Sequence, residues 1–190
     1  SQRSKFMSYL PQMDIDKSTL TVLEMVLLGR LPELGHRVKK EDLDTTLDTL
    51  KALNIEDLAS RCFSELSGGQ KKMVFIAQTL VRNPELILLD EPVNSLDLQR
   101  QLELCQFLKY IIKNKDISII VVLHDINLAA RFADNITVLD KKGKLYSSGT
   151  PKEVVTEEMI KNVYGVISSV YYDIEDLPTL SVIRSVNDNF

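Results

Sequence analysis

The sequence predicts an α/β fold in which a parallel sheet is flanked by helices. Residues 86–89 form an unbroken apolar run, as expected of a strand that is buried on both faces of a parallel sheet. A second apolar run covers residues 117–123, and apolar residues at helical spacing lie between the two runs. Alternation of strand, helix and strand is typical of α/β proteins.

An amphipathic helical segment precedes this alternation, over residues 14–60. Its apolar residues recur at helical spacing, and Pro32 and Gly35 predict a break between two helices. The residues that define the spacing are Val22, Met25, Val26, Leu43, Leu47 and Leu50. We therefore expect a helical lobe in this part of the chain.

The elements after residue 66 are predicted from similar signals. Two helices have apolar faces formed by Met73, Ile76, Ala77 and Leu80, and by Leu98, Leu102, Cys105 and Leu108. A short helix over residues 125–133 and strands at residues 136–139 and near residue 145 follow them. The next helix start is marked by an N-cap, a first-turn proline and a glutamate, at Thr150, Pro151 and Glu153.

The composition is that of a globular protein that does not bind nucleic acid. Of the 190 residues, 44% are hydrophobic and 26% are charged, and the formal net charge is -4. A weakly acidic chain has no long-range attraction for DNA or anionic lipid. There is no signal peptide and no apolar stretch near the ~20 residues that span a bilayer, so we expect a soluble protein. Cys62 and Cys105 are expected to be thiols in a reducing compartment.

Two acidic residues, Asp90 and Glu91, end the first apolar run. Ligands of open α/β sheets bind just beyond the carboxyl ends of the strands, and two carboxylates are unfavourable there unless they have a role. An aspartate at this place can hold Mg2+ through its water shell, and the glutamate can orient and polarise a water molecule. A solvated strand end before a proline turn is an equally simple interpretation.

Two further polar features stand next to predicted elements. Ser67, Gly68, Gly69 and Gln70 directly precede a helix, where glycines allow close approach of a ligand and free amides attract anions. A serine-capped loop is the alternative interpretation. His124 ends the second apolar run and can donate a hydrogen bond to a terminal phosphate, although a partly buried histidine without a role is commoner.

Five motifs in this order resemble the ATP-binding cassette (ABC) ATPase family over nearly the whole chain. Residues 66–70 match the LSGGQ signature letter for letter, and residues 86–92 look like the Walker B strand with its following glutamate. Residues 94–97 resemble the D-loop, residues 122–125 the switch histidine, and residues 9–12 the Q-loop. The resemblance implies a P-loop NTPase-like parallel sheet flanked by helices, with an inserted α-helical subdomain.

The resemblance also implies ATP hydrolysis between two copies of the subunit that face each other head to tail. Asp90 would position Mg2+, Glu91 would act as general base or orient the water, and His124 would contact the γ-phosphate. Gln12 would touch the metal and the attacking water, and Asp97 would link the two sites. The residues assigned to the ATP of the opposite subunit are Ser67, Gly68, Gly69 and Gln70.

The phosphate-binding loop of the family, G-x-x-x-x-G-K-[S/T], does not occur in the sequence. In the family it lies upstream of the Q-loop. We therefore expect an incomplete cassette without the N-terminal strands and the P-loop, inactive alone, which either oligomerises or has a smaller sheet. The sequence also departs from the family at Val93 and Asn94 and at Lys71, Lys72 and Met73, and we expect neither departure to touch a residue assigned to chemistry.

Three stretches resemble importers for iron chelates, haem and cobalamin: residues 26–32, 124–134 and 149–166. This implies an ATPase subunit on the cytoplasmic face of a membrane. It would bind permease subunits there and work indirectly with a periplasmic or extracellular substrate-binding protein. A soluble ABC-type ATPase is one alternative, disfavoured by the compact helical lobe and the single signature. A degenerate, non-catalytic module without a P-loop is the other.

The predicted organisation is one truncated ABC ATPase domain over residues 1–190. Residues 14–62 form its helical subdomain, and residues 1–13 and 63–168 form its RecA-like α/β core. Residues 169–190 are expected to be a last strand and tail, in which we recognise no motif.

Overall fold

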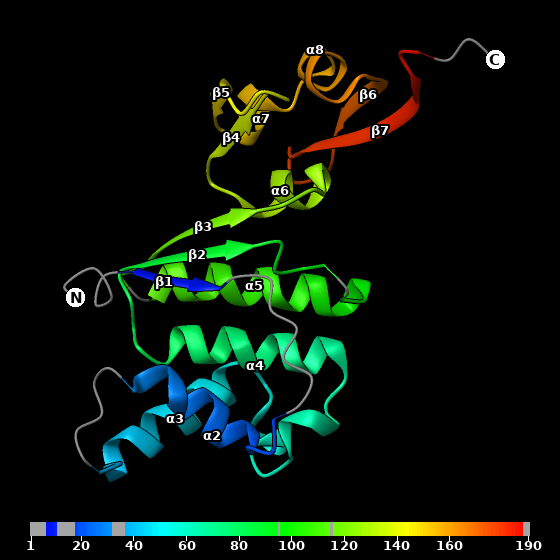
Figure 1. Ribbon diagram of the computed structural model, residues 1–190. Coiled ribbons are helices and arrows are strands. Elements are labelled where there is room, and N and C mark those ends of the chain that lie inside the picture. The colour runs from blue at the N-terminus through cyan, green and yellow to red at the C-terminus, as the bar shows by residue number, and fades with distance from the viewer. Residues whose placement is uncertain (1–6, 11–17, 32–36, 95, 115, 188–190) are drawn as a thin grey trace. The chain divides into compact units, whose positions relative to one another are not determined.

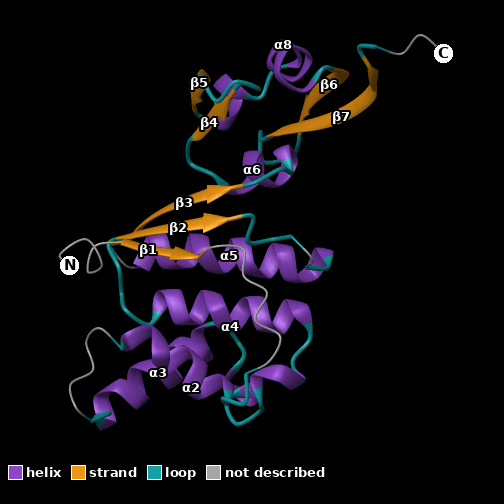
Figure 2. Cartoon of the chain, viewed as in Figure 1, coloured by secondary structure: helices purple, strands orange, loops and turns teal. Residues whose placement is uncertain are grey.

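A computed structural model describes residues 7–10, 18–31, 37–94, 96–114 and 116–187, with the backbone alone for residues 7–10. The chain divides into two compact units, residues 1–122 and 123–190, which are described separately. Both units combine helices and strands (Figure 2), which agrees with the predicted α/β class. Within the described residues, none of the helices combines the length and apolar character that crossing a membrane requires.

The first unit carries a three-stranded parallel sheet in the order β1-β2-β3 (Figure 1). Met7 pairs with Leu86, and Leu86 pairs with Ser118. The strands and helices of this unit are β1 (Met7–Leu10), α2 (Val22–Leu27), α3 (Lys40–Ala52), α4 (Gly68–Leu80), β2 (Leu86–Asp90), α5 (Leu98–Asn114) and β3 (Ser118–Val122). Short 3-10 turns lie at Leu28–Arg30, Glu56–Leu58 and Phe63–Glu65. Both predicted apolar runs are therefore strands of one parallel sheet.

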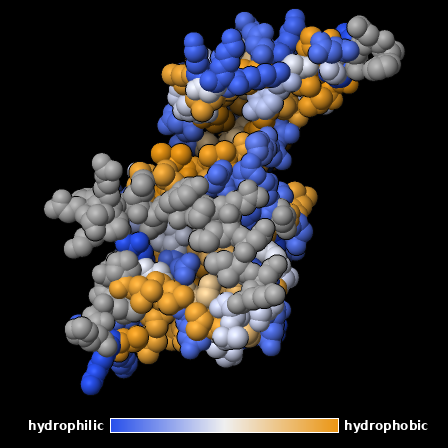
Figure 3. Space-filling model, viewed as in Figure 1, coloured by the Kyte–Doolittle hydropathy of each residue, from blue (hydrophilic) through white to orange (hydrophobic). Residues whose placement is uncertain are grey.

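Among the described residues of this unit, helices cover one face of the sheet. Helices α4 and α5 contact it, and Ile87 and Leu89 of β2 are 1% and 2% exposed. On β3, by contrast, Ile120 and Val122 are 56% and 50% exposed, and Figure 3 shows hydrophobic surface there. Burial on both faces was predicted for β2, where Leu86 and Leu88 are only partly buried, because an apolar run does not reveal whether a partner layer exists.

The helical part of the first unit packs α2 and α3 against α4. Val22, Val26 and Leu50 are completely buried there. A Cβ atom on Gly29 would lie 2.2 Å from the carbonyl oxygen of Gln78, so the turn after α2 touches the backbone of α4 directly. Only a glycine fits this approach.

The buried stripe of α3 differs from the predicted one. It runs through Asp42, Thr46 and Leu50, whereas Leu43 is exposed. Asp42 is accommodated because Arg30 Nε donates to its carboxylate at 3.0 Å, and Arg30 Nη1 donates to a carbonyl of the chain after α4. A paired carboxylate can thus occupy a position for which periodicity predicts a leucine.

The second unit consists of two antiparallel hairpins and short helices. Its elements are α6 (Ile126–Phe132), β4 (Ile136–Leu139), β5 (Leu145–Gly149), α7 (Pro151–Val154), α8 (Glu157–Met159), a π-helical turn (Ile160–Tyr164), β6 (Val166–Tyr172) and β7 (Pro178–Ser185). A small core of Val138, Val154, Met159, Ile160 and Val163 joins the first hairpin to the helices. The predicted capping residues at the start of α7 form the expected capping box.

The end of the chain forms a hairpin, β6–β7, that is attached to α6. The side chain of Asn127 donates to the carbonyl of Leu180 at 3.1 Å and accepts from its amide at 2.6 Å. Arg131 of the same helix pairs with Asp173 at 2.6 Å. The predicted boundaries of the helical subdomain, the RecA-like core and the tail remain predictions.

Candidate functional site

The signature loop (residues 66–70) forms the start of helix α4. Ser67 is the N-cap: its hydroxyl accepts from the amide of Gln70 at 3.3 Å, and the Gln70 side-chain oxygen accepts from the amide of Ser67 at 3.0 Å. This reciprocal capping box fixes the loop locally. The Ser67 hydroxyl proton and the Gln70 side-chain NH2 group remain available as donors to a ligand.

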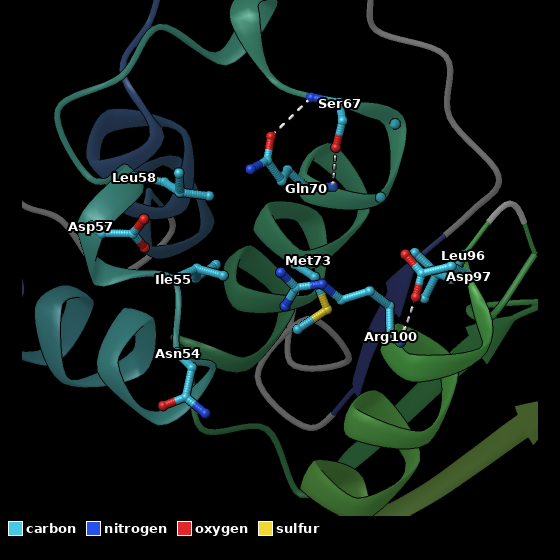
Figure 4. A pocket seen from close by; sticks show the side chains of 12 residues that line it. Asn54, Ile55, Asp57, Leu58, Ser67, Gln70, Met73, Leu96, Asp97 and Arg100 are labelled. Carbon is cyan, nitrogen blue, oxygen red and sulfur yellow. Dashed lines mark hydrogen bonds between the residues drawn. The ribbon is translucent and has the colours of Figure 1, made fainter.

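The signature loop borders a cavity of about 580 Å3, the signature cavity (Figure 4). The segment after α3, the signature loop and the start of α5 line it together. The lining residues outside the signature loop are Asn54, Ile55, Asp57, Leu58, Met73, Leu96, Asp97 and Arg100. A Cβ atom on Gly68 would meet nothing within 4 Å, so the backbone there is open to an approaching molecule.

Asp97 lines the signature cavity beside Leu96, at the start of α5 (Figure 4). Its carboxylate caps α5 by accepting from the amide of Arg100 at 2.9 Å. The structure therefore brings together five residues that we predicted to bind a nucleotide, Ser67, Gly68, Gly69, Gln70 and Asp97.

Arg100 is a cavity residue that the sequence analysis missed. Figure 4 shows its side chain directed toward Met73, and its guanidinium also pairs with Glu103 at 3.0 Å. Arg100 follows Asp97 by one helical turn and therefore faces the same side of α5. This spacing could have identified Arg100 from the sequence. Together with open amides and a hydroxyl, the guanidinium gives the cavity groups that bind anions.

The second cluster of predicted residues is the end of β2. Asp90 is exposed and pairs in register with Val122 of β3. Glu91 continues that pairing through its amide, which donates to the carbonyl of Val122 at 3.1 Å. The chain then turns sharply, because Glu91 has a φ of 48°, in the left-handed region that non-glycine residues seldom adopt.

The turn that follows, the glutamate turn (residues 91–94), is held by two residues that we expected to be unrelated to chemistry. Lys72 Nζ donates to the carbonyls of Glu91 and Asn94, at 2.8 and 2.7 Å. The side-chain amide of Asn94 donates to the Glu91 carboxylate. That expectation was wrong, because contacts across 19 residues of sequence are invisible before the sheet and α4 are placed.

Burial lowers the pKa of the Lys72 ammonium from its usual value, and the nearby charge of Glu91 opposes part of this shift. An ammonium that is half-buried between two carbonyls replaces water by fixed hydrogen bonds. Lys72 is therefore built into the turn and is not a solvated surface lysine.

The structure does not place the two other predicted site residues relative to these clusters. Gln12 lies outside the described residues. His124 lies in the second unit, where it is exposed and precedes Asp125, the N-cap of α6, whose carboxylate accepts from the amide of Leu128 at 2.9 Å. Their contributions to the site stay predictions.

Comparison with known proteins gives matches over most of the chain. Residues 1–94 match a family model described as ABC transporter. An uncharacterised ABC transporter ATP-binding protein of Methanocaldococcus jannaschii is 45% identical over 163 residues, which cover 86% of this chain and 63% of that protein. An iron(3+)-hydroxamate import ATP-binding protein of Bacillus subtilis is 38% identical over 172 residues, or 90% of this chain and 64% of that protein. The chain thus spans less than two thirds of these relatives.

Solved structures match as well. A structure described as a metal-chelate type ABC transporter in an inward-facing conformation superimposes with a TM-score of 0.84 at 24% identity, covering 94% of this chain and 72% of that chain. A dimeric bacterial ABC transporter cassette gives a TM-score of 0.68 at 31% identity, covering 78% of this chain and 64% of that chain. These likenesses confirm the predicted P-loop NTPase-like fold.

Proposed function

We propose, from the premise that this chain is related in sequence and fold to ABC transporter ATP-binding proteins, that it is the nucleotide-binding part of an ABC importer. Its ATP hydrolysis would drive uptake of a metal chelate such as a ferric siderophore, haem or cobalamin. The relative that imports iron(3+)-hydroxamate supports this class of cargo. The partners would be a second copy of the subunit and membrane permease subunits, which would hold the chain at the cytoplasmic face of the membrane.

The observation that carries the proposal is the signature cavity. It gathers a capped serine, two glycines and Asp97 around open space in one unit. Such a surface suits the phosphates of a nucleotide that is bound mainly by another subunit. The match to a dimeric cassette supports a head-to-tail pairing in which each signature cavity faces the partner's nucleotide.

Hydrolysis would take place at the end of β2. Asp90 is exposed at the strand end and fits a Mg2+ ion that keeps most of its waters, because such an ion needs only one or two carboxylates. The ion would neutralise charge on the phosphates. Glu91 would orient the attacking water and accept its proton, with His124 and Gln12 supporting the γ-phosphate and the water.

The pairing and the two roles can be tested by complementation in the complete gene product. Gly68→Asp places a carboxylate in open space beside the proposed phosphate position, where the start of α4 tolerates an acidic group. Glu91→Gln removes the proposed base. Each variant alone is expected to be inactive, whereas a mixture restores hydrolysis, because about half of randomly formed dimers then hold one complete site.

The outcomes separate the competing functions. Absence of restored activity in the mixture, with both variants folded and dimeric, argues against cross-subunit sites. Absence of hydrolysis in the unmutated complete product favours a non-catalytic module. The 190-residue chain itself contains no P-loop string, so it is expected not to hydrolyse ATP, and tight Mg-ATP binding by this chain alone would contradict that expectation.

A further inference from the structure

Lys72 connects two parts of the proposed site that lie far apart in sequence. It stands in α4, five residues after Ser67, the cap of the signature helix. Its ammonium reaches the glutamate turn and donates to the carbonyls of Glu91 and Asn94, at 2.8 and 2.7 Å. One side chain thus joins the helix that presents the signature loop to the turn that presents Glu91.

The conformation of Glu91 depends on contacts of this kind. Its φ of 48° is unfavourable for a residue with a side chain, and such a conformation persists only where neighbours fix it. Its amide donates to Val122, and its carbonyl accepts from Lys72 and, at 3.2 Å, from the amide of Asn94. Of these three bonds, only the one from Lys72 comes from outside the sheet and the turn itself.

The side chain of Glu91 is oriented from within the same turn. The amide group of Asn94 donates to its carboxylate, and the Asn94 carbonyl is in turn held by Lys72. Lys72 therefore fixes both the backbone of Glu91 and the residue that holds the Glu91 carboxylate. Loss of the ammonium would loosen the turn at its first and last residues together.

We propose that Lys72 is a positioning residue that fixes Glu91 for hydrolysis and ties it to the signature helix. This rests on the function proposed above, in which Glu91 acts on the nucleotide of its own subunit and the signature loop touches that of the partner. A displacement of α4 on contact with the partner's nucleotide then reaches Glu91 through the side chain of Lys72. Each of the two ATP sites would sense the occupancy of the other by this route.

The first test measures the turn itself in the 190-residue chain. Lys72→Met keeps the length and the apolar stem but removes both hydrogen bonds. Hydrogen exchange of the Asn94 amide, which donates to Glu91, is expected to become about tenfold faster, while amides of β2 keep their rates. Lys71→Met is the matched control: it removes the same charge from the neighbouring position, where the ammonium lies 5.9 Å from the ring of Phe63.

The second test measures hydrolysis in the complete gene product. Lys72→Met is expected to lower kcat about tenfold with little change in KM, because Glu91 would be misplaced without loss of nucleotide contacts. Lys72→Arg, which can donate to both carbonyls, is expected to recover most of the activity, and Lys71→Met is expected to behave like the unmutated protein.

Each outcome bears on one hypothesis. Unchanged Asn94 exchange in Lys72→Met overturns the contact, and faster exchange with an unchanged kcat overturns the positioning role. If Glu91→Gln also leaves hydrolysis unchanged, the assignment of Glu91 fails, and with it the proposed function, whereas the exchange result still decides whether Lys72 fixes the turn.

Discussion

The signature loop and the glutamate turn belong to the same unit and are held in different ways. The signature loop is fixed by a capping box between Ser67 and Gln70, residues three positions apart, and Gly68 in it faces open space. The glutamate turn is fixed by Lys72 from another element, and its first residue has a left-handed backbone. The signature loop is stabilised by its neighbours in sequence, whereas the glutamate turn is stabilised both from within and by a residue distant in sequence.

This difference fits the roles proposed above, ligand binding for the signature loop and chemistry for Glu91. A loop that has to receive a ligand benefits from open space and donors that are already oriented. A glutamate that has to place one water molecule benefits from a rigid support, and residues in sparsely populated conformations gather at such places. Substitutions in the two regions are therefore expected to have different consequences, and the following variants test this from the largest effect to the smallest.

Glu91→Gln in the complete gene product is expected to reduce kcat by about 100-fold or more, because a general base contributes about that factor. ATP binding is expected to stay nearly unchanged, since the glutamine has the same shape. Steady-state hydrolysis and a nucleotide titration on the same preparation measure both quantities. Retention of full turnover would remove Glu91 from the chemistry and make its turn a purely structural feature.

Ser67→Ala removes the cap of α4 and is expected to lower the free energy of unfolding by about 1 kcal/mol. Urea denaturation of the 190-residue chain measures this. Ser67→Asn is the matched control, because asparagine caps a helix about as well as serine. If both variants unfold alike, the cap does not stabilise the loop and the contrast between the two regions weakens.

Glu91→Gly and Glu91→Ala both remove the carboxylate, but only glycine adopts a φ of 48° without strain. The glycine variant is expected to be more stable than the alanine variant by about 0.5–1 kcal/mol, after allowance for the greater freedom of glycine in the unfolded chain. Thermal or urea unfolding of the two variants side by side measures the difference. Equal stabilities would show that the turn adapts and is not fixed by its surroundings.

Gly68→Ala should have the smallest effect on the free energy of unfolding, and it should raise this free energy, whereas Ser67→Ala should lower it. The added methyl group meets nothing within 4 Å, so the variant is expected to be more stable by about 0.4 kcal/mol through a less flexible unfolded chain. Gly29→Ala provides the contrast, since its methyl group would overlap the carbonyl of Gln78 and destabilise the lobe. A destabilised Gly68→Ala variant would mean that the signature loop is less open than its surroundings indicate.

Local rules predicted a large part of the fold. Strands β2 and β3 of the three-stranded sheet, the helix between them and the caps at Ser67 and Thr150 follow from residues within a few positions of one another, whereas β1 was not predicted. These strands, this helix and these caps need no knowledge of distant parts of the chain. The family resemblance assigned roles to Asp97 and to the signature residues, but their place around one cavity is known from the structure.

The features that sequence reasoning missed depend on long-range placement. Lys72 reaches Glu91 across 19 residues, and the face of α3 that is buried follows from the ion pair between Asp42 and Arg30. No motif in the sequence predicted the hairpin β6–β7. The Asn127 side chain nevertheless forms two hydrogen bonds with the backbone of this hairpin. In each case the partner is chosen by the tertiary fold and not by periodicity.

The half-covered sheet has a practical consequence for anyone who handles this chain alone. β3 lies at an edge of the described sheet, and its sequence is a run of β-branched residues with two strongly exposed side chains, Ile120 and Val122. Chains aggregate through short, uncharged segments of high β-propensity that lie at an exposed sheet edge. Concentrated stocks of the 190-residue chain should therefore lose monomer through this strand while the signature loop and the glutamate turn are still intact.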